Sequence, residues 1–137
     1  MLELRDGKIP VSFLPLMSRP RVLVVEDDAP LAHMYCTALT MNGLSVMRAA
    51  DGLTALRVVE EYRPDVVVLD LMLPQIDGWA VLREFESRPS TRGIPVVVVT
   101  GADTSTVTHA RAVIRKPVDP DYIATVVARH LPPGGPA

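Results

Sequence analysis

Four apolar runs in this sequence are each followed directly by side chains that could take part in chemistry. These side chains are Glu26, Asp27 and Asp28 after RVLVV, Asp70 after VVVL, Thr100 after VVVV, and Lys116 after AVIR. Carboxylates, a hydroxyl and an ammonium can together bind a metal ion or handle a phosphoryl group. The chemistry therefore depends on whether the fold brings these positions together.

Three of these residues, Glu26, Asp27 and Asp70, could not all remain ionised at close range without compensation. Two like charges about 5 Å apart repel each other by roughly 3 kcal/mol at an effective dielectric constant of about 20. Such a group either holds a proton or takes up a cation. An all-oxygen set of ligands suits Mg²⁺ or Mn²⁺.

The remaining side chains would suit a phosphoryl group arriving at Asp70. Lys116 would add a positive charge opposite the metal ion, and Thr100 would supply a hydroxyl. Asp70 would then be the nucleophile and would form an acyl phosphate. Asp28 fits the cap of the following helix better than a metal ligand, because Asp is favoured at that position.

The elements that would position these residues alternate along the chain. Continuous Val-rich or β-branched stretches predict strands, and near-helical apolar spacing predicts helices. We expect strands at 21–25, 44–49, 65–70, 95–100 and 112–115, and helices at 30–42, 51–62, 78–86 and 120–131. This order predicts an α/β fold, a five-stranded parallel sheet that is doubly wound. Ligands of such sheets bind at the carboxyl ends of the strands.

The motifs VLVVEDD, VVVLDLMLPQIDGW, VVVVTG and RKP, in this order, resemble the receiver domain of bacterial two-component response regulators. The resemblance covers residues 21 to about 131, and LDLMLPQIDG is its most specific piece. It implies a flavodoxin-like, receiver-type sheet. It also implies a function, namely to accept a phosphoryl group on Asp70 and to signal by a conformational change.

The resemblance implies a role for each matching position. Asp70 is the phosphoacceptor, and Thr100 and Lys116 contact the phosphoryl group. Mg²⁺ is the implied cofactor, with the ligands Glu26, Asp27, Asp70 and the main-chain carbonyl of Met72. The Lys116–Pro117 bond is implied to be cis.

Partners and location are also implied by the resemblance. The donor is a sensor histidine kinase or a histidine phosphotransfer protein, and the target is a downstream protein. We expect a cytoplasmic monomer or weak homodimer. No direct binding of nucleic acid or of a membrane is expected.

Two features depart from the family pattern. Only fifteen residues separate Thr100 from Lys116, and the segment 102–111 is polar and β-branched, which disfavours a helix. We therefore predict that the fourth helix of the family is shortened or missing. The position that usually holds an aromatic switch residue is Val113, so coupling through an aromatic side chain cannot operate in the usual way.

Composition sets the outer limits of this interpretation. The 137 residues are 48% hydrophobic and 22% charged, with a net charge of −2, which gives no electrostatic footprint for nucleic acid. The single Cys36 excludes an intrachain disulfide and fits a reducing compartment. We expect an irregular extension at 1–20, a receiver domain at 21–131 and a flexible tail at 132–137. The chain is either a free-standing receiver or a fragment of a longer protein.

Two other classes of function compete with a phosphorylated receiver. A pseudo-receiver would keep the fold and act only as a protein-interaction module. An aspartyl phosphatase of the haloacid-dehalogenase type would need a second carboxylate where this chain has Met72. The absence of a GxxxxGK[ST] motif excludes P-loop nucleotide hydrolysis. We therefore expect no enzyme activity beyond self-phosphorylation on Asp70.

We predict that a phosphoryl group on Asp70 is lost slowly. In the family, the positions two residues after the acceptor and two residues after the switch threonine influence hydrolysis. Here they are Met72 and Ala102, and neither side chain can orient an attacking water by hydrogen bonding. Loss of label after removal of the phosphoryl donor measures this, and a half-life on the order of seconds would contradict it.

Overall fold

The computed structural model describes residues 19–132, which form alternating strands and helices. The strands are β1 (Arg21–Val25), β2 (Ser45–Ala49), β3 (Val66–Leu69), β4 (Val96–Thr100) and β5 (Ala112–Arg115). The helices are α1 (Ala29–Met41), α2 (Gly52–Tyr62), α3 (Gly78–Ser87) and α4 (Pro120–Arg129). Each expected element is present, with bounds that differ by at most two residues. The expected extension and tail lie almost entirely outside the described residues.

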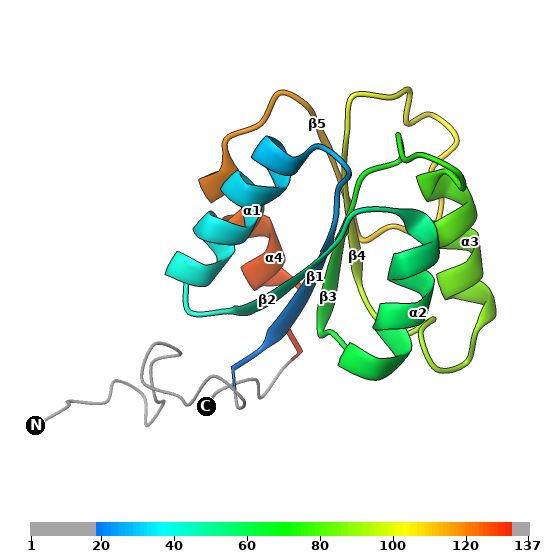
Figure 1. The fold of residues 1–137 in the computed structure, drawn as a ribbon, viewed down its shortest axis with the longest axis horizontal. Helices are drawn as coiled ribbons and strands as arrows, with labels where there is room; N and C mark the ends of the chain where they lie inside the picture. Colours follow the sequence, from blue (N-terminus) through cyan, green and yellow to red (C-terminus); the bar gives the residue numbers. More distant parts are fainter. Residues whose placement is uncertain (1–18, 133–137) are drawn as a thin grey trace, which may run out of the picture.

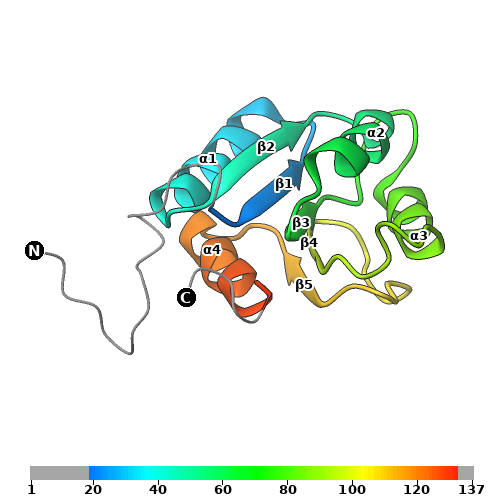
Figure 2. The same cartoon turned by 90° about the horizontal axis from the view of Figure 1, so that it is seen from below.

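The five strands form one parallel sheet in the order β2-β1-β3-β4-β5. Helices α1 and α4 cover one face of the sheet, and α2 and α3 cover the other (Figures 1 and 2). The doubly wound α/β fold is therefore confirmed. Within residues 19–132, no helix combines the length and the apolar character needed to span a lipid bilayer.

The continuous apolar strands alternate between two hydrophobic clusters, one on each face of the sheet. In β1, Val22 and Val24 join the cluster under α1 and α4, whereas Leu23 and Val25 join the cluster under α2 and α3. The valines of β3 and β4 alternate in the same way. A strand buried on both faces must be apolar at every position, which explains the unbroken valine runs.

Each of the four helices starts after an aspartate whose carboxylate accepts a hydrogen bond from a main-chain N–H of the first turn. The pairs are Asp28 with Leu31, Asp51 with Thr54, Asp77 with Ala80 and Asp119 with Asp121. Such caps satisfy amides that have no partner inside the helix. The capping role expected for Asp28 is confirmed, at an N–O distance of 3.0 Å.

The segment between β4 and β5 contains no helix in the described structure, so the predicted loss of the fourth family helix is confirmed. The segment runs as turns beside α3, and Val107 packs against the cluster under α2 and α3 (Figure 1). On β5, Val113 pairs with Val98 and is 41% exposed. The missing helix therefore leaves part of this side of β5 open to solvent.

Gly78, the first residue of α3, lies directly against the main chain of Asp70. A Cβ atom at this position would come within 2.3 Å of the Asp70 carbonyl oxygen and 2.4 Å of Leu71 Cα. The Gly78 N–H also donates to the Leu71 carbonyl, at 2.9 Å. This contact fixes the loop that follows Asp70 against the start of α3.

We predict that Gly78→Ala lowers the free energy of unfolding by about 1–3 kcal/mol, because the new methyl group would force two main-chain segments apart. Urea denaturation measures the change. Gly93→Ala is the matched control, since a Cβ atom there would meet nothing within 4 Å. Equal stability of the two variants would contradict the prediction.

Candidate functional site

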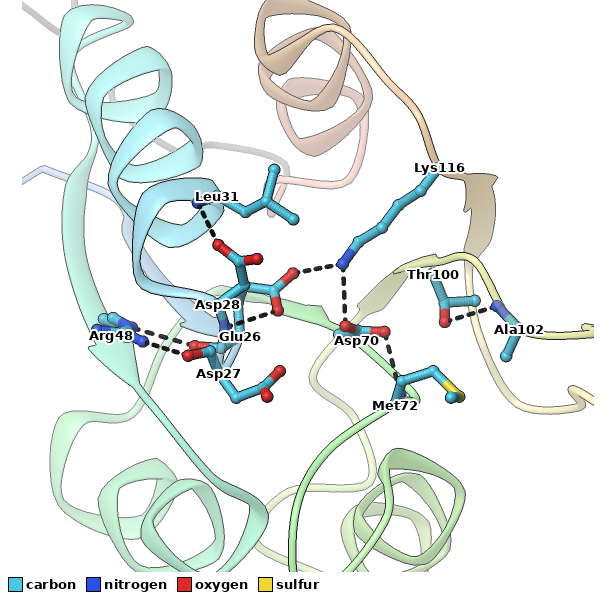
Figure 3. A network of polar contacts seen from close by, with 10 residues as sticks. All are labelled: Glu26, Asp27, Asp28, Leu31, Arg48, Asp70, Met72, Thr100, Ala102 and Lys116. Atoms are coloured by element: carbon cyan, nitrogen blue, oxygen red, sulfur yellow. Dashed lines mark hydrogen bonds and ion pairs between the residues drawn. The ribbon is translucent and has the colours of Figure 1, made fainter.

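Four of the predicted site residues meet at the carboxyl edge of the sheet. Glu26, Asp27 and Asp70 each offer a carboxylate oxygen, and these oxygens lie within 4.8 Å of one another. Lys116 reaches them from the end of β5 (Figure 3). Within residues 19–132, this is the only group of acidic, histidine or cysteine side chains arranged to hold a metal ion.

Lys116 bridges two buried carboxylates. Its Nζ atom lies 2.6 Å from Glu26 Oε1 and 3.0 Å from Asp70 Oδ2. Glu26 and Asp70 are only 2% and 4% exposed, so this ion pair is well shielded from water. The main-chain N–H of Lys116 donates to the Thr100 carbonyl, at 2.9 Å, and this hydrogen bond connects the end of β5 to β4. The Lys116–Pro117 bond is cis, as expected.

Burial and charge change the proton affinities of this ion pair. Burial raises the pKa of Glu26 above its ordinary value, although hydrogen bonds from Lys116 and from the Asp28 N–H oppose the shift. Burial acts to lower the pKa of Lys116, but its hydrogen bonds to Glu26 and Asp70 outweigh burial, so this pKa is raised. Lys116 is therefore an ammonium at neutral pH.

The Asp70 carboxylate is held on both oxygens. Oδ2 accepts from Lys116, and Oδ1 accepts from the Met72 N–H at 3.0 Å. The second hydrogen bond brings the main chain of Met72 beside the carboxylate, whereas its side chain is 61% exposed. The Asp70 N–H donates to the Val25 carbonyl, at 3.0 Å, so Asp70 is fixed relative to the end of β1.

Thr100 lies at the end of β4 and is fully buried. Its hydroxyl oxygen accepts a hydrogen bond from the Ala102 N–H, at 3.2 Å. Figure 3 shows this hydroxyl on the same side of the site as Asp70 and Lys116. The hydroxyl proton remains available for an acceptor placed near Asp70.

Asp27 differs from the other two acidic residues because it is exposed. If all three carboxylates are ionised, the single ammonium of Lys116 leaves a net charge of about −2 in the group. Hard oxygen ligands and a charge of this sign fit a divalent cation such as Mg²⁺. The donor set is therefore compatible with the cation expected from the sequence.

Sequence reasoning did not find Arg48 on β2. Its guanidinium donates to the main-chain carbonyls of Glu26 and Asp27, at 3.1 Å in each case (Figure 3). A single arginine in an edge strand has no motif around it. Since every residue has a main-chain carbonyl, a side chain that donates to carbonyls cannot be recognised from the types of its partner residues.

A cavity of about 520 Å³ lies at the other edge of the sheet, where the strands begin. Arg111, Arg129 and His130 are among its lining residues, and none of the acidic cluster is. Among the described residues, no ion pair lies in the lining of this cavity. The chemistry of the predicted residues therefore points to the carboxyl edge.

Comparison with known proteins gives one consistent family. The model of the response regulator receiver domain matches residues 22–128. The DNA-binding response regulator MtrA of Mycolicibacterium paratuberculosis is 41% identical over 119 residues, covering 81% of this chain and 51% of that protein. Response regulator MprA of Mycobacterium sp. (strain KMS) is 40% identical over 84 residues, covering 61% and 36%. The chain thus spans about half the length, or less, of these curated relatives.

Solved structures have the same fold. A putative response regulator from Chloroflexus aurantiacus superposes with a TM-score of 0.75 at 29% identity, covering 81% of this chain and 96% of that one. Chemotaxis response regulator CheY4 of Vibrio cholerae gives a TM-score of 0.76 at 24% identity, covering 82% and 99%. At that identity the second similarity supports the fold alone.

We predict that Lys116→Met lowers the free energy of unfolding by about 2 kcal/mol at neutral pH without divalent cations. This is less than the cost of breaking a fully buried pair, because the lysine side chain is 20% exposed. In the variant, the Glu26 carboxyl would lose the Lys116 hydrogen bond that opposes the effect of burial, so its pKa would lie further above its value in the unfolded chain. Stability should then fall as pH rises, so the deficit shrinks on acidification.

Urea denaturation in EDTA at several pH values measures this difference. Arg92→Met is the control, because it removes an exposed cation that lies outside the cluster. A deficit that is absent at neutral pH, or that grows on acidification, would contradict the charge balance described here.

Proposed function

Because the chain belongs to the response regulator receiver domain family, we propose that it accepts a phosphoryl group on Asp70 from a histidine kinase or a histidine phosphotransfer protein. The observation that carries the proposal is the bridge of Lys116 between Glu26 and Asp70, with Thr100 beside it (Figure 3). The proposed receiver spans residues 21–131. It turns over no separate substrate.

In this proposal, an Asp70 carboxylate oxygen attacks the phosphorus of a phosphohistidine, and the phosphorus–nitrogen bond breaks. Lys116 stabilises the negative charge that builds up on the phosphoryl oxygens. Since Lys116 already lies 3.0 Å from Asp70 Oδ2, its ammonium needs little rearrangement to follow the new group. The Met72 N–H holds the acceptor carboxylate in orientation.

Mg²⁺ is the proposed cofactor. Glu26, Asp27, Asp70 and the main-chain carbonyl of Met72 would hold it, with Asp27 the more direct of the acidic pair. When bound, the ion would neutralise charge on the phosphoryl oxygens and allow them to approach three carboxylates. The exposed position of Asp27 supports entry of the ion from solvent.

Thr100 is the proposed residue that senses the phosphoryl group. Its hydroxyl would donate to a phosphoryl oxygen, and the Ala102 N–H links this hydroxyl to the segment without a helix. The proposed output is a changed conformation of that segment, passed by contact to a downstream protein. The relative MtrA is described as a DNA-binding response regulator. This chain matches only about half of that protein.

The pseudo-receiver remains the alternative hypothesis. It would require that phosphorylation plays no part in signalling. Asp70, Thr100, Lys116, Glu26 and Asp27 are all present and close together (Figure 3), which favours the phosphorylated receiver. The exposed Val113 and the missing helix are the features that the alternative would use.

We predict that acetyl phosphate phosphorylates the natural chain only in the presence of Mg²⁺, and that Asp70→Asn abolishes the reaction. The amide has the shape of the carboxylate but is not a nucleophile for phosphorus. Intact-mass analysis detects the added phosphoryl group. Asp121→Asn on the exposed start of α4 is the matched control and should react normally. Labelling of the Asp70 variant, or none of the natural chain, would overturn the proposed function.

A further inference from the structure

Arg48 makes a two-point contact with the main chain of the acidic loop, residues 26–28 between β1 and α1. Its Nε atom donates to the Glu26 carbonyl and its Nη2 atom donates to the Asp27 carbonyl, each at 3.1 Å (Figure 3). The planar guanidinium offers these donors at a fixed spacing, so it specifies the relative position of two successive carbonyls. An ammonium cannot impose the same constraint, because its donors rotate about one atom.

The other hydrogen bonds of this loop hold main-chain N–H groups, whereas Arg48 holds the carbonyls of Glu26 and Asp27. The Glu26 N–H donates to the Ala49 carbonyl, at 3.1 Å, and the Asp28 N–H donates to Glu26 Oε2, at 3.2 Å. The Asp27 side chain itself is exposed, and no hydrogen bond to it occurs within residues 19–132. The position of its carboxylate therefore follows from the position of its main chain.

We infer that Arg48 is a positioning residue that holds Asp27 and Glu26 in place to bind a divalent cation. The inference rests on the proposed function, since it concerns the same acidic cluster. Within residues 19–132, Arg48 donates only to main-chain carbonyls of Glu26 and Asp27, so it occupies none of the three carboxylates. Residues that orient metal ligands without contacting the metal are important for binding, and their mutation commonly weakens metal affinity by about 10- to 100-fold.

The charge of Arg48 acts in the opposite direction, because a guanidinium repels a divalent cation. Arg48 is exposed, and solvent and salt screen exposed charges. The positioning effect is therefore the larger of the two. The two effects predict opposite changes when the side chain is replaced, which makes them separable by experiment.

The test is a calorimetric titration of Mg²⁺ into the full chain and into Arg48→Lys and Arg48→Met. Lysine keeps the charge and loses the two-point geometry, whereas methionine loses both. We expect both variants to bind Mg²⁺ about tenfold more weakly than the natural chain. Arg129→Met, which removes an exposed arginine at the other edge of the sheet, should bind like the natural chain.

Labelling by acetyl phosphate supplies the second readout. If Arg48 acts through ion binding, the Arg48 variants should need about tenfold more Mg²⁺ for half-maximal labelling but should reach the natural rate at saturation. A purely structural role would instead lower the thermal midpoint in EDTA and the saturated rate together.

Each outcome decides between the possibilities. Tighter Mg²⁺ binding by Arg48→Met would show that charge dominates, and natural affinity in Arg48→Lys would show that the two-point geometry is not needed. Either result overturns the inference while leaving the proposed function intact. Failure of the natural chain to bind Mg²⁺ or to be labelled would overturn the proposed function itself.

Discussion

One ammonium shared by two buried carboxylates is the constraint around which the described structure is organised. Glu26 and Asp70 follow different strands, and Lys116 supplies the positive charge between these two buried carboxylates. This ion pair requires the ends of β1, β3 and β5 to lie close together. The parallel sheet supplies that arrangement, because the carboxyl ends of all its strands meet at one edge.

Much of the fold could be predicted because its signals are local. Unbroken valine runs indicated strands buried on both faces, and Asp28 before an apolar segment indicated a helix start. The missing helix was predictable from the shortness of the segment between Thr100 and Lys116. The contact between Gly78 and the main chain of Asp70 was not, because it depends on how two parts of a loop pack in space.

The candidate site shows the same division. Glu26, Asp27, Asp70 and Lys116 were predicted to converge because each follows a strand, and the structure brings them together. The sharing of one lysine between Glu26 and Asp70 was not predicted, since Lys116 was expected to face a metal ion. Arg48 escaped notice because its partners are carbonyls, which every residue has.

The edge strand β5 affects whether two molecules can pair through their sheets. The outer side of β5 presents main-chain groups that another chain could pair with, and such edges promote aggregation when they are long and apolar. Here β5 has only four residues, and the exposed Arg111 and Arg115 lie at its two ends. A second molecule that extended the sheet would bring like charges together. Pairing of two chains through β5 is therefore disfavoured, even though the apolar Val113 is partly exposed there.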